Sequence, residues 1–308
     1  MITVWRGIAN QWDCDEMGHM NVRVYVEKAM EGLAVFAARI DMPHAFSANT
    51  PSTLIPADQH IRFMREALPG RPLTMTAQVL EIGESDAVIY QEMQHSDGST
   101  AAAFRTRVIH AEAGSAKPFP WSSRSRVALE RLTEAEPEAT APRSVDPNGP
   151  FRPLTEATVE EADKIGAPTI GMGAVPPGHC DLNGRMRPEH FMGRISDSVP
   201  NLLHEWRQSI AEAAGEGVRM GAAVLEYRLV YRRWPRAGDR FEVRTSLGET
   251  GEKVHSLVHW VMDPETGLPW VTSEAVAVTF DLDKRKVIPT PKPQIEELAE
   301  LAPPGLSI

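Results

Sequence analysis

Cysteine, long apolar runs and excess positive charge are what this sequence lacks. Its two cysteines, Cys14 and Cys180, are too few for a disulfide framework and fit a reducing cytoplasm. No stretch approaches the roughly 20 apolar residues of a membrane-spanning helix. The first residues show no basic region followed by an apolar run, so we expect no signal peptide. The net charge of −10 argues against nucleic acid or an anionic membrane surface as the main partner. The sequence therefore predicts a cytoplasmic protein with neither partner.

Metal and nucleotide motifs are also missing. The ten histidines show no ligand spacing, and neither cysteine belongs to a His–Cys metal pattern. The segment GMGAVPPG lacks the helix context of a dinucleotide-binding loop. We therefore expect no metal and no cofactor. What is present, 42% hydrophobic and 24% charged residues in a chain of 308, is typical of a soluble globular protein with room for two domains.

The sequence also repeats itself. Asp181 follows Asp15 at an offset of 166 residues (181 − 15), and nine further identities share this offset. These identities pair Thr3, Gly7, Cys14, Gly18, Met20, Arg62, Pro69, Val88 and Asp97 with Thr169, Gly173, Cys180, Gly184, Met186, Arg228, Pro235, Val254 and Asp263. The period exceeds the roughly 20 to 50 residues of solenoid repeats, so it indicates a duplicated domain.

The repeat and the local composition divide the chain into four parts. We predict a first domain at 1–114 and a second at 165–292. Residues 115–164 are rich in Pro, Ser, Ala and Glu, which is typical of a linker, and 293–308 form a Pro-containing tail.

Each copy has the pattern of one helix followed by a strand meander. Apolar residues at spacings of three and four predict helices over 26–40 and 192–210, and Pro200 should kink or interrupt the second helix. About four strand-like segments follow each helix, and this order predicts the α+β class.

The start of the first helix carries a motif with chemical content. Residues 12–32, WDCDEMGHMNVRVYVEKAMEG, are similar to the corresponding segment of 4-hydroxybenzoyl-CoA thioesterase-like and acyl-ACP thioesterase-like hotdog proteins. The resemblance implies two fused hotdog domains, each a long helix wrapped by an antiparallel sheet. Together they would form internally the pseudo-dimer that single-copy hotdogs form between chains.

In copy one the resemblance implies a catalytic carboxylate at Asp15, acting as nucleophile or as general base for water. Gly18, His19 and Asn21 complete the motif. Backbone N–H groups near Gly18 and His19 would polarise the thioester carbonyl, because such donors stabilise the developing oxyanion and glycine admits a substrate close to the backbone. The alternative is that Asp15 merely caps the helix and His19 is a polar surface residue.

Copy two departs from this motif. Asp181 keeps the acid, and Asn183 falls where acyl-ACP thioesterases place an asparagine, a position that Met17 fills in copy one. Arg185 replaces the histidine. Three interpretations stay open: a weaker site, a site in which Arg185 binds an anionic part of the substrate, or a remnant that only shapes the pocket.

Further polar residues are candidates for substrate binding. Glu31 follows Asp15 by 16 positions (31 − 15), where the resemblance implies an acidic residue, although a helix carboxylate with a local partner explains it as well. Four arginines are candidates for the phosphates of coenzyme A, because guanidinium forks suit phosphate oxygens: Arg62, Arg228, Arg232 and Arg233. Solvated strand ends are the alternative for these arginines.

The function that the resemblance implies is hydrolysis of an acyl-CoA thioester to a free acid and CoA, at the interface of the two copies. Two alternatives stay open: a hotdog hydratase or dehydratase acting on acyl-CoA, and a non-catalytic acyl-CoA-binding protein. An acyl-CoA is thus the expected partner, and we also expect association into a homo-oligomer.

Overall fold

The computed structural model describes residues 1–214, 220–302 and 307–308, apart from the side chains of 203–214, 297, 300 and 301. The chain splits into two compact units. Unit 1 comprises Met1–Pro142 together with Gly178–His190, and unit 2 comprises Arg143–Pro177 together with Phe191–Ile308. The motif of the second copy, residues 179–187, therefore belongs to unit 1.

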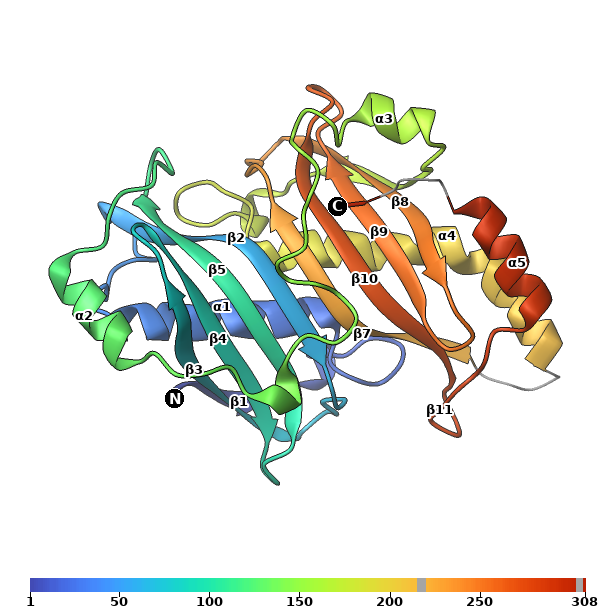
Figure 1. The fold of residues 1–308 in the computed structure, drawn as a ribbon, viewed down its shortest axis with the longest axis horizontal. Helices are drawn as coiled ribbons and strands as arrows, with labels where there is room; N and C mark the ends of the chain where they lie inside the picture. The colour runs from blue at the N-terminus through green and yellow to red at the C-terminus, as the bar shows by residue number, and fades with distance from the viewer. Residues whose placement is uncertain (215–219, 303–306) are drawn as a thin grey trace. The chain divides into compact units, whose positions relative to one another are not determined.

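Unit 1 is an antiparallel sheet with one long helix on its face (Figure 1). Its sheet has the order β1-β3-β4-β5-β2. The strands are β1 (Ile2–Ile8), β2 (Ser52–Phe63), β3 (Pro72–Ile82), β4 (Asp86–His95) and β5 (Thr100–Glu112). The helices are α1 (Val22–Arg39) and α2 (Ser123–Arg131), with short 3₁₀ turns at Gln11–Asp13 and Glu138–Thr140. This arrangement confirms the predicted α+β class.

Helix α1 packs closely against the sheet through a small residue. Its buried face includes Val26, Leu33 and Phe36, at the spacing of three and four predicted from the sequence. A Cβ on Gly32 would lie 2.8 Å from Nε2 of Gln91 on β4, so glycine allows the close approach at this point. The same Gln91 Nε2 donates to the carbonyl oxygen of Ala29 at 2.8 Å, which fixes the helix over β4.

Unit 2 has the same layout. Its sheet has the order β7-β10-β9-β8-β6, and β11 pairs with β10. The strands are β6 (Thr169–Ala174), β7 (Met220–Tyr231), β8 (Arg240–Thr250), β9 (His255–Met262), β10 (Pro269–Asp281) and β11 (Lys286–Val287). The helices are α3 (Val159–Lys164), α4 (Pro188–Ala214), which belongs to unit 2 from Phe191 onward, and α5 (Lys292–Leu301). A 3₁₀ turn at Pro177–His179 begins where the chain passes from unit 2 to unit 1. Helix α4 continues past Pro200, so of the predicted kink or interruption the interruption is wrong, and the kink stays a prediction.

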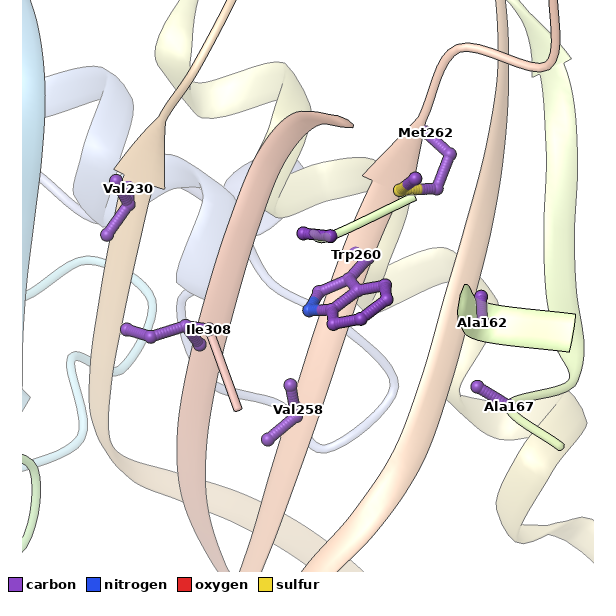
Figure 2. Packing of buried hydrophobic residues seen from close by; sticks show 8 residues of the cluster. Ala162, Ala167, Val230, Val258, Trp260, Met262 and Ile308 are labelled. Atoms are coloured by element: carbon purple, nitrogen blue, oxygen red, sulfur yellow. The ribbon is translucent and has the colours of Figure 1, made fainter. Parts of the chain in front are cut away.

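One hydrophobic cluster of unit 2 joins distant parts of the chain. Trp260 on β9 lies at its centre, with Val258 and Met262 from the same strand and Val230 from β7 (Figure 2). The cluster also includes Ala157, Ala162, Ala167 and the last residue, Ile308. The indole N–H of Trp260 donates to the carbonyl oxygen of Ser307 at 3.1 Å, so the C-terminal residues pack on this sheet.

In the helix-opening turns, the two copies keep the offset of 166 residues. Cys180 pairs with Met186 as Cys14 pairs with Met20, and Gly184 has the positive φ of Gly18. These positions are therefore structurally equivalent, as the repeat predicted.

From the strand after the helix onward the offset is larger, and between β2 and β7 it is 168 residues. Strand β2 ends at Phe63 and β7 at Tyr231 (231 − 63 = 168), and the glycines with positive φ before the next strands, Gly70 and Gly238, differ by the same number. The second copy thus has two more residues between its motif and β7. The four identities at 166 from Arg62 onward do not mark equivalent positions, which corrects the ungapped alignment of the sequence.

The segment between the repeats lies against the sheets. In unit 1, Nη1 of Arg62 donates to the carbonyl oxygens of Ala139 and Ala141 at 3.2 and 2.6 Å. In unit 2, Nη1 of Arg228 donates to those of Asp146 and Gly149 at 3.2 and 2.6 Å. We call residues 134–152 the connecting segment.

Among the described residues, no helix combines the length and apolar character that crossing a bilayer requires.

Candidate active site

A tight turn ahead of α1 presents the first candidate acid. The N–H of Asp15 donates to the carbonyl oxygen of His19 at 3.1 Å, and the N–H of Gly18 donates to that of Asp15 at 3.0 Å. Gly18 has a φ of 80°, in the left-handed region that favours glycine. A Cβ at this position would meet no atom within 4 Å, so the backbone beside Gly18 is open on that side.

The helix cap is Asn21. Its Oδ1 accepts a hydrogen bond from the N–H of Arg23 at 2.9 Å, as expected of an N-cap. The alternative in which Asp15 caps the helix is therefore wrong, because Asn21 occupies that position.

The Asp15 carboxylate is partly buried. Oδ1 accepts the N–H of Met17 at 3.0 Å, and 18% of the side chain is exposed. Burial raises the pKa of the Asp15 carboxyl above its usual range, and the charge of His19 and the N–H of Met17 oppose this effect. A carboxylate with a raised pKa is a stronger base near neutral pH.

His19 brings an imidazole beside this carboxylate. Its Nδ1 lies 3.7 Å from Oδ1 of Asp15, and its Nε2 lies 3.9 Å from Oε1 of Glu66. Both separations exceed hydrogen-bond length. Within the described part of the chain, the buried Nε2 has no hydrogen-bond partner. Since buried polar atoms are nearly always paired, this nitrogen is suited to bind a ligand atom.

This arrangement changes one detail of the predicted oxyanion site. The Gly18 N–H, expected to polarise a thioester carbonyl, is donated to the Asp15 carbonyl oxygen instead. The backbone N–H of His19 forms a hydrogen bond with the Asp15 carboxyl and lowers its pKa. Among the buried side-chain atoms that the structure describes in this turn, Nε2 of the His19 ring is the one without a hydrogen-bond partner.

Glu66 was not identified from the sequence. It follows β2, and its neighbour Ala67 accepts the N–H of Met20 at 2.8 Å and donates its own N–H to the hydroxyl of Tyr25 at 3.1 Å. Glu66 is far from the motif in sequence and lies in the loop between β2 and β3. A local pattern search therefore had no signal with which to find it.

The turn of copy two has the same backbone. The N–H of Asp181 donates to the carbonyl oxygen of Arg185 at 2.7 Å, and the N–H of Gly184 donates to that of Asp181 at 3.0 Å. Oδ1 of Asp181 accepts the N–H of Asn183 at 2.8 Å, which matches the Met17 contact of copy one. The motif thus encodes one turn twice.

The acid of copy two has different partners. Its Oδ1 also accepts the N–H of Arg185 at 2.9 Å, and Nε of the same arginine lies 3.4 Å from Oδ2. Only 7% of the Arg185 side chain is exposed. The guanidinium predicted to bind an anionic substrate group is therefore buried beside Asp181.

A second polar cluster lies at the start of α4, in residues that sequence reasoning did not single out. The rings of His179 and His190 stack with centroids 3.7 Å apart. Nη2 of Arg187 lies 2.8 Å from Nε2 of His190, and because a guanidinium only donates, the imidazole nitrogen accepts. Burial raises the pKa of the neighbouring Glu189, whose Oε1 lies 3.2 Å from Nη1 of Arg187.

Glu31 is engaged within α1 and with β1. Its Oε2 accepts the indole N–H of Trp5 at 2.7 Å, and its Oε1 lies 2.9 Å from Nζ of Lys28. The local-partner interpretation accounts for these contacts.

The four candidate arginines make contacts within the chain. Arg62 and Arg228 hold the connecting segment, as described above. Nη1 of Arg232 donates to the carbonyl oxygen of Arg152 at 2.8 Å. Nη2 of Arg233 lies 3.1 Å from Oδ2 of Asp263. These bonds give the arginines structural roles. Arg62, which shares unit 1 with Asp15, donates to the connecting segment.

Metal chemistry has no obvious location in the described residues. No group of three or more His, Cys, Asp or Glu side chains there is arranged to hold a metal ion. Cys14 and Cys180 are both free thiols, and Sγ of Cys14 donates to the carbonyl oxygen of Asn10 at 3.3 Å.

Comparison with known proteins identifies the family. The model of the thioesterase-like superfamily matches the chain twice, over residues 9–131 and 175–300. The chain therefore belongs to this superfamily, with one match for each copy. No curated protein matches the chain in sequence.

Two solved structures resemble the chain over most of its length. An acyl-ACP thioesterase from Bacteroides thetaiotaomicron is 12% identical, with a TM-score of 0.62 over 89% of this chain and 96% of that chain. A 12:0-ACP thioesterase from Umbellularia californica is 11% identical, with a TM-score of 0.67 over 90% of this chain and 93% of that chain. At these identities the likeness concerns the fold, which is the tandem hotdog fold. The internal pseudo-dimer stays a prediction.

Proposed function

We propose that the chain hydrolyses acyl thioesters, with acyl-CoA as substrate and Asp15 of the first copy as the catalytic carboxylate. The observation that carries the proposal is the geometry around Asp15. A carboxyl with a raised pKa lies beside an imidazole whose buried Nε2 is unpaired, next to an open backbone at Gly18. Thioester hydrolysis needs a base or nucleophile and a donor for the developing oxyanion, and these groups supply both.

The proposed reaction uses Asp15 as general base. Its carboxylate removes a proton from water while the water oxygen attacks the thioester carbonyl carbon. The Nε2–H of His19 donates to the carbonyl oxygen, which becomes negative in the tetrahedral intermediate. The C–S bond then breaks, the carbonyl re-forms, and the thiolate of CoA takes the proton from Asp15. Direct attack by the carboxylate is the other role for Asp15, and a single turnover in ¹⁸O water distinguishes them. General-base catalysis places the label in the released acid, whereas direct attack followed by attack of water on the Asp15 carboxyl carbon of the anhydride places the label in Asp15.

Copy one is proposed as the principal site because of the contacts of the two acids. Asp15 accepts backbone N–H groups and faces an imidazole, whereas Asp181 accepts two N–H groups and the buried guanidinium of Arg185. The Asp181 carboxylate is thus engaged by a neighbouring side chain of fixed charge. In copy two, Asp181 and Asn183 are then residues of a structural turn.

The experiment is an assay of free-thiol release. Purified full-length chain is offered short, long, branched and aromatic acyl-CoAs in the presence of a chelator, and the best acyl group is then tested on an acyl carrier protein. Release from at least one acyl-CoA is expected. No release from any acyl-CoA, with release from the acyl carrier protein, would correct the substrate. Hydration or dehydration of an enoyl-CoA or hydroxyacyl-CoA without thiol release would overturn the proposal, as would binding of acyl-CoA without any turnover.

A further inference from the structure

We propose that Glu189 and Arg187, at the start of α4, bind a hydroxyl group in the acyl part of the substrate, so that the chain prefers hydroxylated acyl thioesters. The inference rests on the proposed function and deepens it, because it names the class of acyl group. Neither residue takes part in the proposed hydrolysis, and their role is to select the substrate.

The cluster at the start of α4 lies in the unit that contains Asp15. Residues 178–190 belong to unit 1, and the charges of Glu27 and Arg23, in the first two turns of α1, act on the carboxyl of Glu189. Glu27 is the sixth residue of α1, which places it roughly 7 Å along the axis from the start of the helix. The helix that follows the Asp15 turn therefore contributes to the surroundings of Glu189.

Two buried atoms of this cluster lack a hydrogen-bond partner within the described part of the chain. They are Oε2 of Glu189 and Nε of Arg187. The Glu189 residue is only 2% exposed, and its other carboxyl oxygen, Oε1, lies 3.2 Å from Nη1 of Arg187. Nη2 of Arg187 donates to Nε2 of His190 and to the carbonyl oxygen of Gly178, at 2.8 and 3.2 Å. Because buried polar atoms are nearly always paired, an acceptor and a donor left over on two contacting side chains indicate a site for a polar group.

The chemistry of these two atoms favours a hydroxyl group. The Nε–H of Arg187 only donates, and an ionised carboxylate only accepts, whereas a hydroxyl does both. Burial raises the pKa of the Glu189 carboxyl, and if the carboxyl is protonated, a hydroxyl accepts its hydrogen bond equally well. A charged group would be unbalanced beside two carboxylates and two guanidinium groups, those of Glu27, Glu189, Arg23 and Arg187.

The first copy forms the same turn without this cluster. At the offset of 166, Arg187 corresponds to the cap Asn21, and His190 corresponds to the buried Val24 (187 − 21 and 190 − 24). Copy two has a guanidinium and an imidazole where copy one has a helix cap and an apolar side chain. Pro188 suits the first position of α4, because proline has no N–H that needs a partner there. The polar cluster is therefore not a requirement of the turn, and a buried carboxylate with an unpaired oxygen is suited to bind a ligand.

The test compares hydrolysis of acyl-CoA pairs that differ by a hydroxyl group, such as hexanoyl with 3-hydroxyhexanoyl and benzoyl with each hydroxybenzoyl isomer. In the wild-type chain, at least one hydroxylated member should exceed its parent about tenfold or more in kcat/KM, as expected of a hydrogen bond to a charged group. In Glu189→Leu this ratio should fall to about one, because the parent no longer leaves a buried carboxylate unpaired and the hydroxylated member no longer finds an acceptor.

The matched control is Glu160→Leu. Glu160 is an exposed glutamate at the second position of α3, as Glu189 is at the second position of α4, so both substitutions remove a negative charge from the first turn of a helix. Glu160→Leu should keep the wild-type ratio.

If Glu189→Leu is unfolded by circular dichroism at the assay temperature, Glu189→Gln decides. It keeps the shape of the side chain and removes the charge, so its ratio should lie at least about threefold below that of the wild type, because hydrogen bonds to a charged group are the stronger ones. An unchanged ratio in this variant overturns the inference.

The other results that overturn the inference are a wild-type chain that hydrolyses acyl-CoAs without preference within any pair, and a preference that survives Glu189→Leu. Equal losses on both members of each pair in Glu189→Leu, with Glu160→Leu unaffected, also overturn it, since they would assign Glu189 to the amides of the pantetheine arm or to the fold. A wild-type chain without any thioester hydrolysis overturns the proposed function instead.

Discussion

Nε of Arg185 lies 3.4 Å from Oδ2 of Asp181, inside the same backbone turn that in copy one places an imidazole beside Asp15. One substitution in a duplicated motif thus exchanges an imidazole for a guanidinium, which is always charged. Asp181 is paired and hydrogen-bonded, and it is suited to hold the turn. Burial raises the pKa of Asp15, and its neighbours offset this effect only in part, so Asp15 is suited to react.

Asp15→Asn should abolish most turnover. The amide keeps the size of the side chain and its Oδ1 still accepts the Met17 N–H, but it is neither base nor nucleophile. Loss of such a group often costs about 10² to 10⁴ in rate, or roughly 3 to 5 kcal/mol in the barrier. Thiol release from the best acyl-CoA, measured under single-turnover conditions, checks this, and a loss of less than about tenfold would contradict it.

The same variant should not lose stability. Because burial raises the pKa of Asp15 in the folded state, the folded chain binds this proton more tightly than the unfolded chain does. The resulting stabilisation is complete below the unfolded pKa and is lost as the pH rises through the folded pKa. At pH 7 the ionised Asp15 is therefore unfavourable, and Asp15→Asn is expected to unfold at the wild-type temperature or above it.

Asp181→Asn should show the opposite combination. It leaves the buried guanidinium of Arg185 without its counter-charge, which we expect to cost about 1 to 2 kcal/mol of stability, since Asp181 itself is partly exposed. Turnover at a temperature where the variant is folded should fall less than in Asp15→Asn. Thermal unfolding and kcat measured on both variants give the comparison, and equal losses of kcat would remove the case for copy one as the principal site.

The acid side of the pH profile should report Asp15. The raised pKa predicts that kcat falls with decreasing pH at a pH above that of an ordinary aspartate. The charge of Glu16 contributes to raising this pKa, so Glu16→Gln should move the acid limb to lower pH. Rates on a substrate whose acyl group does not ionise, from about pH 3.5 to 8, provide the measurement. An acid limb that moves to higher pH in Glu16→Gln would show that another group controls it.

The sequence predicted the turn well because local chemistry determines it. Gly18 and Gly184 are required by positive φ, and the Asp, Gly and Cys positions recur at a single offset. The hydrogen bonds of such a short segment are made within the segment, so its sequence determines its structure. The motif formed by Asp15, His19 and Asn21 was therefore sufficient to locate the candidate site.

What the sequence did not predict depends on long-range register. The offset changes by two residues between the motif and β7, in a region whose length no local rule fixes, so Arg62 was paired with Arg228 although the strands place Val230 at that position (230 − 62 = 168). The same shift concealed the exchange of Glu66 for Trp234 (234 − 66 = 168). The carbonyl oxygens that accept from Arg62 and Arg228 lie about 80 positions away in the connecting segment. From the sequence alone, an arginine that binds such carbonyls cannot be distinguished from one that binds a phosphate.

Arg62→Met and Arg228→Met distinguish these two roles. Each methionine keeps an apolar stem and removes the guanidinium that donates to two carbonyl oxygens of the connecting segment. A hydrogen bond of this kind contributes about 0.5 to 1.5 kcal/mol, so both variants should unfold at a lower temperature, and Arg228→Met should lose more because Arg228 is buried.

The KM for acyl-CoA should be unchanged in both variants, because their guanidinium groups are engaged by the chain. Arg39→Met, at the exposed end of α1, is the matched control, and it should change stability by no more than about 0.5 kcal/mol. Calorimetry gives the stability, and initial rates over a range of acyl-CoA concentrations give KM. A KM raised about tenfold or more with an unchanged unfolding temperature would show that the arginine concerned binds the phosphates of coenzyme A. Loss of a charged phosphate contact weakens substrate binding without lowering the stability of the fold.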